Sequence, residues 1–344
     1  MRFGVLGTGR ITRRLVADLQ STAGITVDAI ASRDEGRARW SGTEYGIAKA
    51  YGDYAALLGD PDLDAVYVAL PPALHTQWCL DAAAAGKHIL CEKPLATSLA
   101  DVRAIDQSCR EHGVRWLDAT AWMHHERTQQ LRQWIDARMI GKLKHISAAI
   151  SFFEPFQHND HRLDPALGGG CVLDLGWYAA GAAILAAGAP RRAIASMLWR
   201  DAAARRCSGI LWFDDDVTAT VNCGYDMATR KWCEWAGDEA SIVCDDFSRP
   251  WADRPARVWV HNRAGEVQKH EFGGSQERNM IAKLASSEPL GWYHLQAMRT
   301  QAAVDAMIRS GESGQVEIVE SIDDIEPNEA GTATSTDADK ETSS

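Results

Sequence analysis

A lysine, an aspartate and a tyrosine occupy positions from which they could share acid/base chemistry. Lys93 follows a short apolar run in the stretch "HILCEKPLA". Asp174 and Tyr178 are four residues apart in "GGGCVLDLGWYAAGAAIL", so a regular helix would place both on one face. An aspartate in so apolar a helix needs a cationic partner, and Lys93 is the natural one. The three residues together predict proton transfer to or from an alcohol or a carbonyl.

Each of these residues also has a simpler interpretation. A lysine in a turn is usually solvated, and a tyrosine in an apolar helix is often a core residue with a satisfied hydroxyl. The position of Lys93 at a strand end, with Pro94 fixing the chain direction after it, favours a catalytic role. In one assignment Tyr178 carries the proton, Lys93 lowers the pKa of Tyr178 and Asp174 orients Lys93. In the other, Lys93 itself is the acid or base, and the sequence does not decide between them.

The start of the chain, "FGVLGTGRITRRL", has the pattern G-x-G-x-x-T between an expected strand and an expected helix. The first glycine permits a tight turn, the second lets a pyrophosphate approach the backbone, and the helix N-terminus offers free N–H groups. Thr12 replaces the third glycine. The pattern predicts dinucleotide binding over a merely structural turn, and the expected contacts are Gly7, Thr8, Gly9, Arg10 and Ile11.

The choice of dinucleotide depends on the end of the second expected strand, which reads "AIASRDE". An NAD site usually has an acidic residue there for the ribose hydroxyl. This chain has Ser32 and Arg33, which could bind a 2′-phosphate by hydrogen bond and by charge. We therefore expect NADP, with NAD as the alternative. Ser32 and Glu35 also have the spacing of a helix capping box, and Arg33 could simply be solvated.

The elements that must position these groups alternate between strands and helices over residues 1–122. Short apolar runs at 2–6, 25–31, 65–70, 88–91 and 114–119 are separated by helical stretches, which predicts an α/β, doubly wound parallel sheet of the Rossmann type. Ligands of such sheets bind at the carboxyl ends of the strands. Further contacts to the dinucleotide are therefore expected from Leu70, Pro71, His75, Glu92 and Lys93.

The pattern changes in residues 123–321, which read as a second, α+β domain. Eight strand-like segments between 144 and 272 predict a large, open, mostly antiparallel sheet, interrupted by helices near 124–138, 170–187, 276–286 and 291–310. One face of that sheet would lack a helical cover. The tryptophans on its strands would then mark a subunit interface, although they could equally be core residues: Trp199, Trp212, Trp232, Trp235 and Trp259.

Composition excludes several classes of function. The chain has 344 residues and a formal net charge of −11, without a basic stripe suited to nucleic acid. No apolar run is long enough for a membrane span, and the N-terminus does not resemble a signal peptide, so we expect no membrane partner and a cytoplasmic location. The eight cysteines lack zinc-site spacing, so no metal is expected. Residues 322–344 read as a disordered acidic tail.

Taken together, these motifs resemble the Gfo/Idh/MocA oxidoreductases over about residues 1–320. The resemblance rests on the glycine turn, on "AGKHILCEKPLA", on "YGDYAALLGDPDLDAVYVALPPALH" and on "RLDPALGGG" followed by D-x-G-x-Y. It implies that Lys93 contacts substrate and nicotinamide, that the bond before Pro94 is cis, and that Asp174 belongs to the site. Tyr178 in place of the more usual histidine is similar to the subgroup of glucose–fructose oxidoreductase, xylose dehydrogenases and dihydrodiol dehydrogenases.

The resemblance also sets expectations for the substrate and the assembly. We expect an NADP-dependent oxidoreductase that transfers hydride to or from a sugar or polyol, with Trp122, Arg162 and Trp177 at the substrate. A dihydrodiol or other non-sugar alcohol is the alternative substrate, and a dinucleotide-sensing protein without turnover is the alternative class. The family dimerises through its open sheet, which implies a homodimer or a dimer of dimers. The stretches "WMHH", "FEPFQHNDHR" and "FSRPWADRPARVW" differ from the sequences usual in this subgroup, so they do not identify the substrate.

Overall fold

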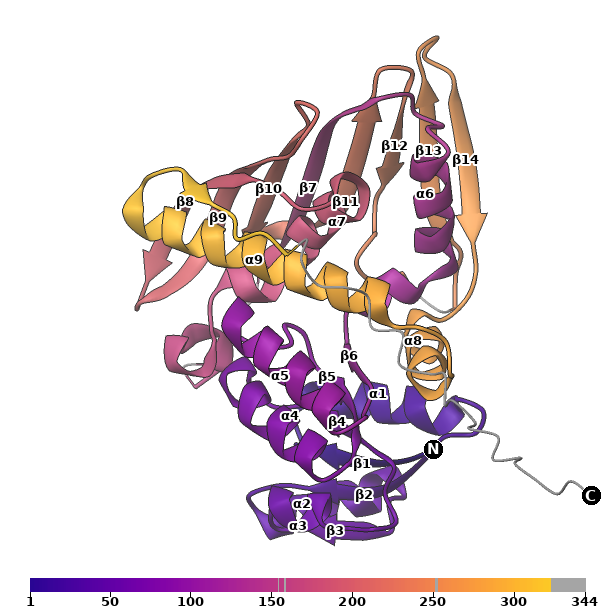
Figure 1. Cartoon of the computed structure of the whole chain (residues 1–344), viewed down its shortest axis with the longest axis vertical. Helices are drawn as coiled ribbons and strands as arrows, with labels where there is room; N and C mark the ends of the chain where they lie inside the picture. The colour runs from indigo at the N-terminus through magenta and orange to yellow at the C-terminus, as the bar shows by residue number, and fades with distance from the viewer. Residues whose placement is uncertain (154, 158, 251–252, 323–344) are drawn as a thin grey trace, which may run out of the picture.

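The computed structural model describes residues 1–153, 155–157, 159–250 and 253–322. Two sheets make up its frame, with the first in the lower half of Figure 1 and the second in the upper half. The first sheet has six parallel strands in the order β3-β2-β1-β4-β5-β6. Its strands are β1 (Arg2–Leu6), β2 (Thr26–Ala31), β3 (Lys49–Tyr51), β4 (Ala65–Val68), β5 (His88–Cys91) and β6 (Trp116–Asp118).

This order is that of a dinucleotide-binding Rossmann fold, as the alternating pattern predicts. The strands form because apolar and β-branched residues fill them, and β4 is buried along its whole length. Between the strands run α1 (Arg10–Ser21), α2 (Glu35–Tyr45), α3 (Tyr54–Leu58), α4 (His75–Ala84) and α5 (Leu99–Glu111). The strand order reverses between β1 and β4, and a ligand crevice opens at such a point.

The second sheet has nine strands in the order β14-β13-β12-β11-β7-β10-β9-β8-β15. It is mostly antiparallel, as predicted, but β7 and β10 pair in parallel. Its strands are β7 (Leu143–Phe153), β8 (Arg192–Arg200), β9 (Ala203–Trp212), β10 (Thr218–Gly224), β11 (Asp226–Gly237), β12 (Ala240–Cys244), β13 (Ala256–Asn262), β14 (Val267–Phe272) and β15 (Glu317–Ile318).

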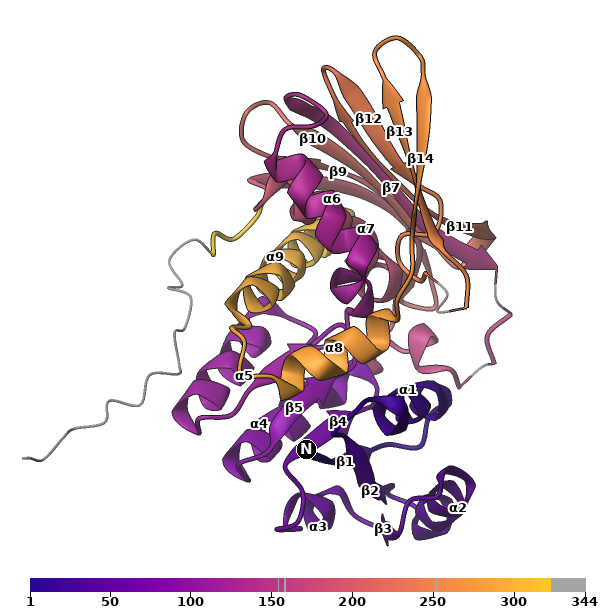
Figure 2. The same cartoon turned by 90° about the vertical axis from the view of Figure 1, so that its right-hand side faces the viewer.

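Helices lie on one face of this sheet, as Figure 2 shows. They are α6 (Glu126–Asp136), α7 (Trp177–Ala187) and α9 (Gly291–Ser313), while α8 (Gln276–Ala285) reaches down beside α1 of the first sheet. Trp199 and Trp232 are partly exposed. Trp235 is an exception among the tryptophans predicted for an open face, since it is buried and its indole N–H donates to the Ala182 carbonyl of α7.

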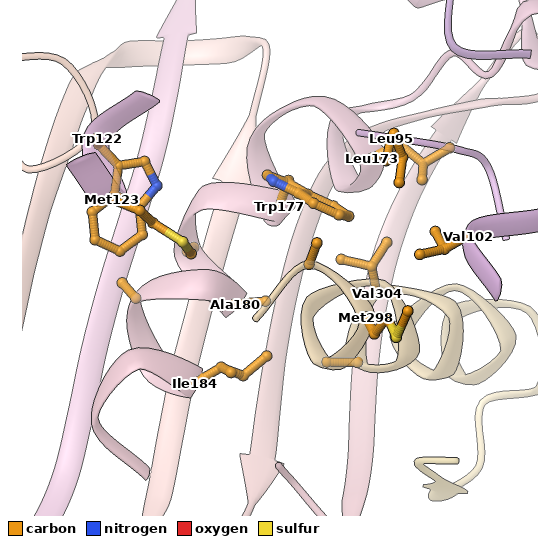
Figure 3. Close-up of a cluster of buried hydrophobic side chains, with 14 of the residues drawn as sticks. Leu95, Val102, Trp122, Met123, Leu173, Trp177, Ala180, Ile184, Met298 and Val304 are labelled. Carbon is orange, nitrogen blue, oxygen red and sulfur yellow. The ribbon is translucent and has the colours of Figure 1, made fainter. Parts of the chain in front are cut away.

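A continuous apolar core joins the two halves of the molecule. Side chains after β5 and on α5, among them Leu95 and Val102, pack in the same cluster as α7 and α9 (Figure 3). The stretch Pro165–Ala187 has the length and hydropathy of a membrane span, but 72% of its most apolar window is buried inside the protein. It is therefore explained as a core helix.

The end of the described chain differs from the predicted tail. Val319 follows β15, and both Val319 and Ile322 are buried in the core cluster. Ile322 was predicted to begin the tail, and its burial contradicts that boundary. The rest of the predicted disordered tail, residues 323–344, lies outside the described residues.

Candidate active site

A cavity of about 320 Å³ lies where the two halves of the molecule meet. Its walls come from α1, from the ends of β4, β5 and β6, from β7 and β11, and from α8. Among the predicted site residues, those that line it are Ile11, Leu70, Glu92, Lys93, Arg162, Asp174 and Tyr178. Segments far apart in the sequence therefore line one cavity.

The turn after β1 has the geometry that a dinucleotide phosphate needs. Gly7 has a φ of +110°, and a Cβ there would lie 2.3 Å from the Ala69 carbonyl oxygen, so only glycine fits. A Cβ on Gly9 would meet nothing within 4 Å, which leaves open space in front of the first N–H groups of α1. Thr12 is buried and its hydroxyl donates to the Gly7 carbonyl at 3.3 Å. These residues fit a bound pyrophosphate.

The other turn residues, Thr8 and Arg10, stand at the start of α1. The Arg10 side chain is 82% exposed, and its Nη2 lies 3.4 Å from Asp160 Oδ2. Asp160 belongs to the segment after β7, so this contact joins that segment to the start of α1. The contact is weak in water because it is so exposed.

The end of β2 differs from the prediction in one respect. The N-cap of α2 is Asp34, whose carboxylate accepts from the Arg37 N–H, and not Ser32. Ser32 is buried, and its hydroxyl oxygen accepts from the Asp34 N–H at 3.3 Å. The predicted capping box of Ser32 and Glu35 is therefore wrong, because the chain enters the helix two residues later. Arg33 is exposed at the strand end.

Asp174 is the centre of a buried ion cluster. Lys93 Nζ donates to Asp174 Oδ1 at 2.5 Å and to the Asp174 carbonyl at 2.7 Å. Arg162 Nε donates to Oδ2 at 2.9 Å, and the Tyr225 hydroxyl lies 3.0 Å from the same atom. The peptide bond between Lys93 and Pro94 is cis, as the resemblance implied. One carboxylate thus holds two cations and one phenol.

These contacts set the protonation of the cluster. Burial alone would raise the pKa of Asp174, but the charges of Lys93 and Arg162 hold it well below its usual range. Burial would likewise lower the pKa of Lys93, yet Asp174 and Tyr178 outweigh it and the pKa is raised. Asp174 is therefore ionised and Lys93 protonated at neutral pH.

Tyr178 faces the same cavity from the start of α7. Lys93 Nζ lies 4.8 Å from the centroid of its ring, so the ammonium contacts the ring face. Burial raises the pKa of Tyr178, and the opposing effect of Lys93 does not reverse this. Lys93 acts to lower the pKa of Tyr178, as expected, but burial is the larger effect and Asp174 also disfavours ionisation of the phenol.

The helix that carries Asp174 is not regular. Residues Val172–Gly176 form a π-helical turn, and α7 begins only at Trp177. The predicted spacing of Asp174 and Tyr178 on one face of an α-helix therefore does not apply. Both side chains still line the cavity, because the wider turn carries Asp174 toward Lys93. Such turns are often found at functional sites.

His75 does not reach the cavity. Its ring is fully buried, with Nδ1 2.9 Å from the Pro94 carbonyl and Nε2 2.8 Å from the Leu70 carbonyl. Burial lowers the pKa of His75. The expected contact between His75 and a dinucleotide is thus replaced by a bridge between the ends of β4 and β5. Pro71 stands at the end of β4, and its neighbour Pro72 lines the cavity.

Trp122 and Trp177 are also absent from the cavity wall. Each is 1% exposed, and Figure 3 shows both within the buried apolar cluster. Trp122 lies in a short 3-10 helix, Ala121–His124, in which Ala121 takes the position at the cavity. The prediction that these tryptophans contact substrate is therefore not supported. Arg162 is the member of that predicted set that lines the cavity.

Trp177 belongs instead to a chain of buried hydrogen bonds between the two halves. Its indole N–H donates to the Thr120 hydroxyl oxygen at 2.8 Å, and that hydroxyl donates to Asp118 at the end of β6. Burial is the main reason why the pKa of Asp118 is raised to about 6. These hydrogen bonds tie Trp177, the residue before Tyr178, to the end of β6. That strand lies next to β5, which ends just before Lys93.

Several cavity residues were not identified from the sequence. Tyr225 follows β10, Lys231 lies on β11 and Arg249 follows β12, and all three line the cavity. So do Gln276 and Glu277 at the start of α8, where Glu277 accepts from Arg14 of α1 at 2.6 Å. The position of Tyr225, directly after a strand that ends in a glycine, was only a weak indication of a place at the site. The others depend on the packing of the second sheet.

The fold and the site together define an oxidoreductase that uses a nicotinamide dinucleotide. Residues 1–121 match the family model described as "Oxidoreductase family, NAD-binding Rossmann fold", and residues 128–243 match "GFO/IDH/MocA C-terminal domain". The chain belongs to the Gfo/Idh/MocA family. The resemblance inferred from the motifs is thereby confirmed.

Several relatives of this chain have names that state an activity. D-xylose 1-dehydrogenase (NADP(+)) 2 of Haloferax volcanii is 40% identical over 67% of this chain and 72% of its own. A dTDP-3,4-didehydro-2,6-dideoxy-alpha-D-glucose 3-reductase of Actinomadura kijaniata is 30% identical over 90% of this chain and 95% of its own. The crystal structure of KijD10, a 3-ketoreductase from that organism, with NADP and TDP-benzene, superposes with a TM-score of 0.83 at 28% identity, covering 90% and 97% of the two chains.

Proposed function

We propose that the protein is an NADP-dependent oxidoreductase that interconverts a carbinol and a carbonyl on a sugar or polyol. The observation that carries this proposal is the convergence of Lys93, Asp174 and Tyr178 on one cavity beside the phosphate turn. The named activities of the xylose dehydrogenase and the ketoreductase, both acting on sugars, support it. A dihydrodiol substrate is less well supported, because Trp122 and Trp177, whose rings would suit an aromatic-derived alcohol, lie in the core.

The residues divide the work according to their protonation. When bound, the nicotinamide supplies or accepts the hydride. Tyr178 is protonated at neutral pH, since burial raises its pKa, so it can give a proton to a carbonyl oxygen. Lys93 uses two N–H groups on Asp174 and has a third for the substrate oxygen. Asp174 keeps Lys93 charged and fixed in position, while Arg162 and Tyr225 hold Asp174.

The end of β2 supports NADP over NAD. Arg33 is exposed there and Ser32 lies beside it, whereas the carboxylate of Asp34 is occupied as a helix cap. A guanidinium at this position suits a phosphate better than a ribose hydroxyl. The printed names of the xylose dehydrogenase and of the ketoreductase complex both include NADP.

The face of the nine-stranded sheet away from α7 and α9 supports a homodimer or a dimer of dimers. Large apolar side chains are partly exposed on these strands, namely Leu198, Trp199, Ile210 and Trp232. Exposed apolar surface of this kind usually marks an interface. All eight cysteines are buried free thiols, which supports the cytoplasmic location that we propose.

A panel of aldoses, ketoses and cyclitols tests the proposed activity with NADP, NADPH, NAD and NADH. We expect turnover of at least one sugar or polyol, with a higher kcat/KM for the phosphorylated cofactor, followed by nicotinamide absorbance. Tight cofactor binding without turnover of any of these compounds would contradict the proposed substrate class. Light scattering of the purified protein measures the assembly, and a monomer at micromolar concentration would contradict the proposed dimer.

A further inference from the structure

The described lining of the cavity is richer in positive than in negative side chains. Five cationic residues face it, against three acidic ones. The cations are Arg14, Lys93, Arg162, Lys231 and Arg249, and the acids are Glu92, Asp174 and Glu277. A neutral sugar does not require this excess of positive charge. Whether the cations lie near the phosphate turn or near the nine-stranded sheet therefore bears on what the cavity binds.

Most of these charges already have partners. Arg14 pairs with Glu277 at 2.6 Å beside the phosphate turn. Lys93 and Arg162 share the carboxylate of Asp174, and Arg162 also pairs with Asp160 at 3.4 Å, so the charges of that cluster are matched within it. Glu92 is buried and accepts a hydrogen bond from the Tyr67 hydroxyl at 2.6 Å, and burial raises its pKa.

Lys231 stands where the strand pattern would place an apolar residue. Its neighbours on the same face of β11, Cys233 and Trp235, are fully buried against the helices. Its ammonium lies 3.9 Å from Asp246 Oδ1, which is too far for a hydrogen bond, and that oxygen has no hydrogen-bond partner among the described residues. The Lys231 side chain is 29% exposed, and it lines the cavity.

Arg249 reaches the cavity from the loop after β12. It is exposed, and it lines the same cavity as Tyr178, the proposed proton donor. Lys231 and Arg249 both belong to the nine-stranded sheet and its loops. The phosphate turn follows β1 of the other sheet and has Arg10 and Arg14 beside it. The phosphates of the cofactor therefore do not account for Lys231 and Arg249.

We propose that the substrate carries an anionic group, a carboxylate or a phosphate, that binds to Lys231 and Arg249 while its carbinol or carbonyl lies at Lys93 and Tyr178. This inference rests on the proposed function and names the substrate class of the same site. Two cations that converge on one anion make charge-assisted hydrogen bonds, which are stronger than those to a neutral hydroxyl. The anion would also accept hydrogen bonds from the Lys231 ammonium, which Asp246 is too distant to accept.

The test compares matched anionic and neutral substrates. The anionic arms are glucuronate and galacturonate for a carboxylate, glucose 6-phosphate for a phosphate monoester, and dTDP-glucose for a diphosphate. Glucose, galactose and xylose are the neutral arm. We expect at least one anionic arm to exceed its neutral counterpart by about tenfold or more in kcat/KM, since each hydrogen bond to a charged group corresponds to a factor of about 10 to 100. Neutral sugars equal to or better than every anionic arm would overturn the proposal.

Two variants locate the effect at these residues. Arg249→Gln and Lys231→Gln should each lower the ratio of anionic to neutral kcat/KM by about 10- to 100-fold, because the ratio cancels any effect on Tyr178. Lys269→Gln is the matched control, since Lys269 lies on β14 and pairs with Glu271 outside the cavity. An unchanged ratio in both test variants would overturn the assignment of the anion to this pair.

Two binding measurements test the anion site without requiring turnover. Fluorescence titration with NADPH should give the same Kd for both variants as for the parent, and a loss there would assign the two cations to the cofactor instead. Calorimetric titration of the NADP-loaded protein with the four anionic compounds tests binding even if nothing is turned over. Binding that disappears in Arg249→Gln supports the inference although the proposed reaction fails, whereas absent binding of all four compounds overturns it.

Discussion

Lys93 donates hydrogen bonds to two oxygens of Asp174, one in the carboxylate and one in the main chain. The pair links the end of β5 in the first sheet to the π-helical turn before α7 in the second half of the chain. Because the main-chain oxygen is one of the two acceptors, the position of the ammonium depends on the backbone of that turn as well as on a side-chain rotamer. The rigidity of this contact underlies the first two predictions.

Replacing Lys93 by methionine should lower kcat by a factor of about 10² to 10⁴, the range expected when a group that assists proton transfer is lost. Methionine keeps most of the side-chain volume but removes the charge, so the substrate oxygen loses its partner. The dissociation constant of NADPH should change little, because the phosphate turn is untouched. Steady-state kinetics and fluorescence titration measure the two quantities. Lys144→Met on β7 is the control, and a kcat within a few-fold of the parent in Lys93→Met would refute the mechanism.

Replacing Asp174 by asparagine should move the alkaline limb of the pH–kcat profile to lower pH. Without the carboxylate, burial is free to lower the pKa of Lys93. The variant should also lose about 3–5 kcal/mol of unfolding free energy at neutral pH, because two buried cations lose their counter-charge. In the parent, the lowered pKa of Asp174 gives stability above about pH 4 that is lost as the pH falls.

Urea unfolding and pH–rate profiles check both parts of this prediction. Asp164→Asn is the matched control, since Asp164 lies in the same part of the chain but is exposed, and its carboxylate accepts from the Ala166 N–H at 3.0 Å. Its alkaline limb should stay where it is in the parent. An alkaline limb that does not move in Asp174→Asn would show that this carboxylate does not govern Lys93.

Asp118 should change the stability with pH in the direction opposite to Asp174. Its pKa is raised to about 6 by burial, so the folded protein holds this proton more tightly than the unfolded chain. Its contribution to stability is therefore present below about pH 4 and is lost as the pH rises to about 6. Over that interval, the parent should lose up to about 3 kcal/mol relative to Asp118→Asn. Parallel stability curves for the two proteins, measured by urea unfolding across this range, would contradict the prediction.

Replacing Arg33 by alanine should weaken NADP binding by about 10- to 100-fold, because a charge-assisted contact to the 2′-phosphate is lost. The affinity for NAD should change by no more than a few-fold. Arg39→Ala is the control, since Arg39 lies on α2, just after this strand end, and pairs with Glu35. Equal losses for the two cofactors would show that Arg33 does not select the phosphate.

Much of the frame could be predicted from the sequence because its signals are local. The strand of "HILC" and the turn at Gly7 and Gly9 follow from apolar runs, glycines and their flanks. The contact of Lys93 with Asp174 could also be inferred, because a carboxylate among apolar residues needs a cation. These arguments need only a few neighbouring residues and a general rule about burial.

The remaining features depend on packing that the sequence does not display. Trp122 was placed at the substrate, but the short 3-10 helix turns Ala121 to the cavity instead. The π-helical turn at Asp174 and the parallel pairing of β7 with β10 leave no distinct residue pattern. Lys231 and Arg249 could not be placed, since only the folded second sheet brings them to the cavity.

The contact between α1 and α8 has a consequence for engineering. Arg14 belongs to the first helix of the chain, while its partner Glu277 follows 263 residues later, and both border the cavity. A chimaera that joined residues 1–122 to the substrate half of another relative would therefore exchange part of the wall around the cofactor, not only the pocket for the sugar. Module exchange in this protein has to carry α8 together with the dinucleotide-binding half.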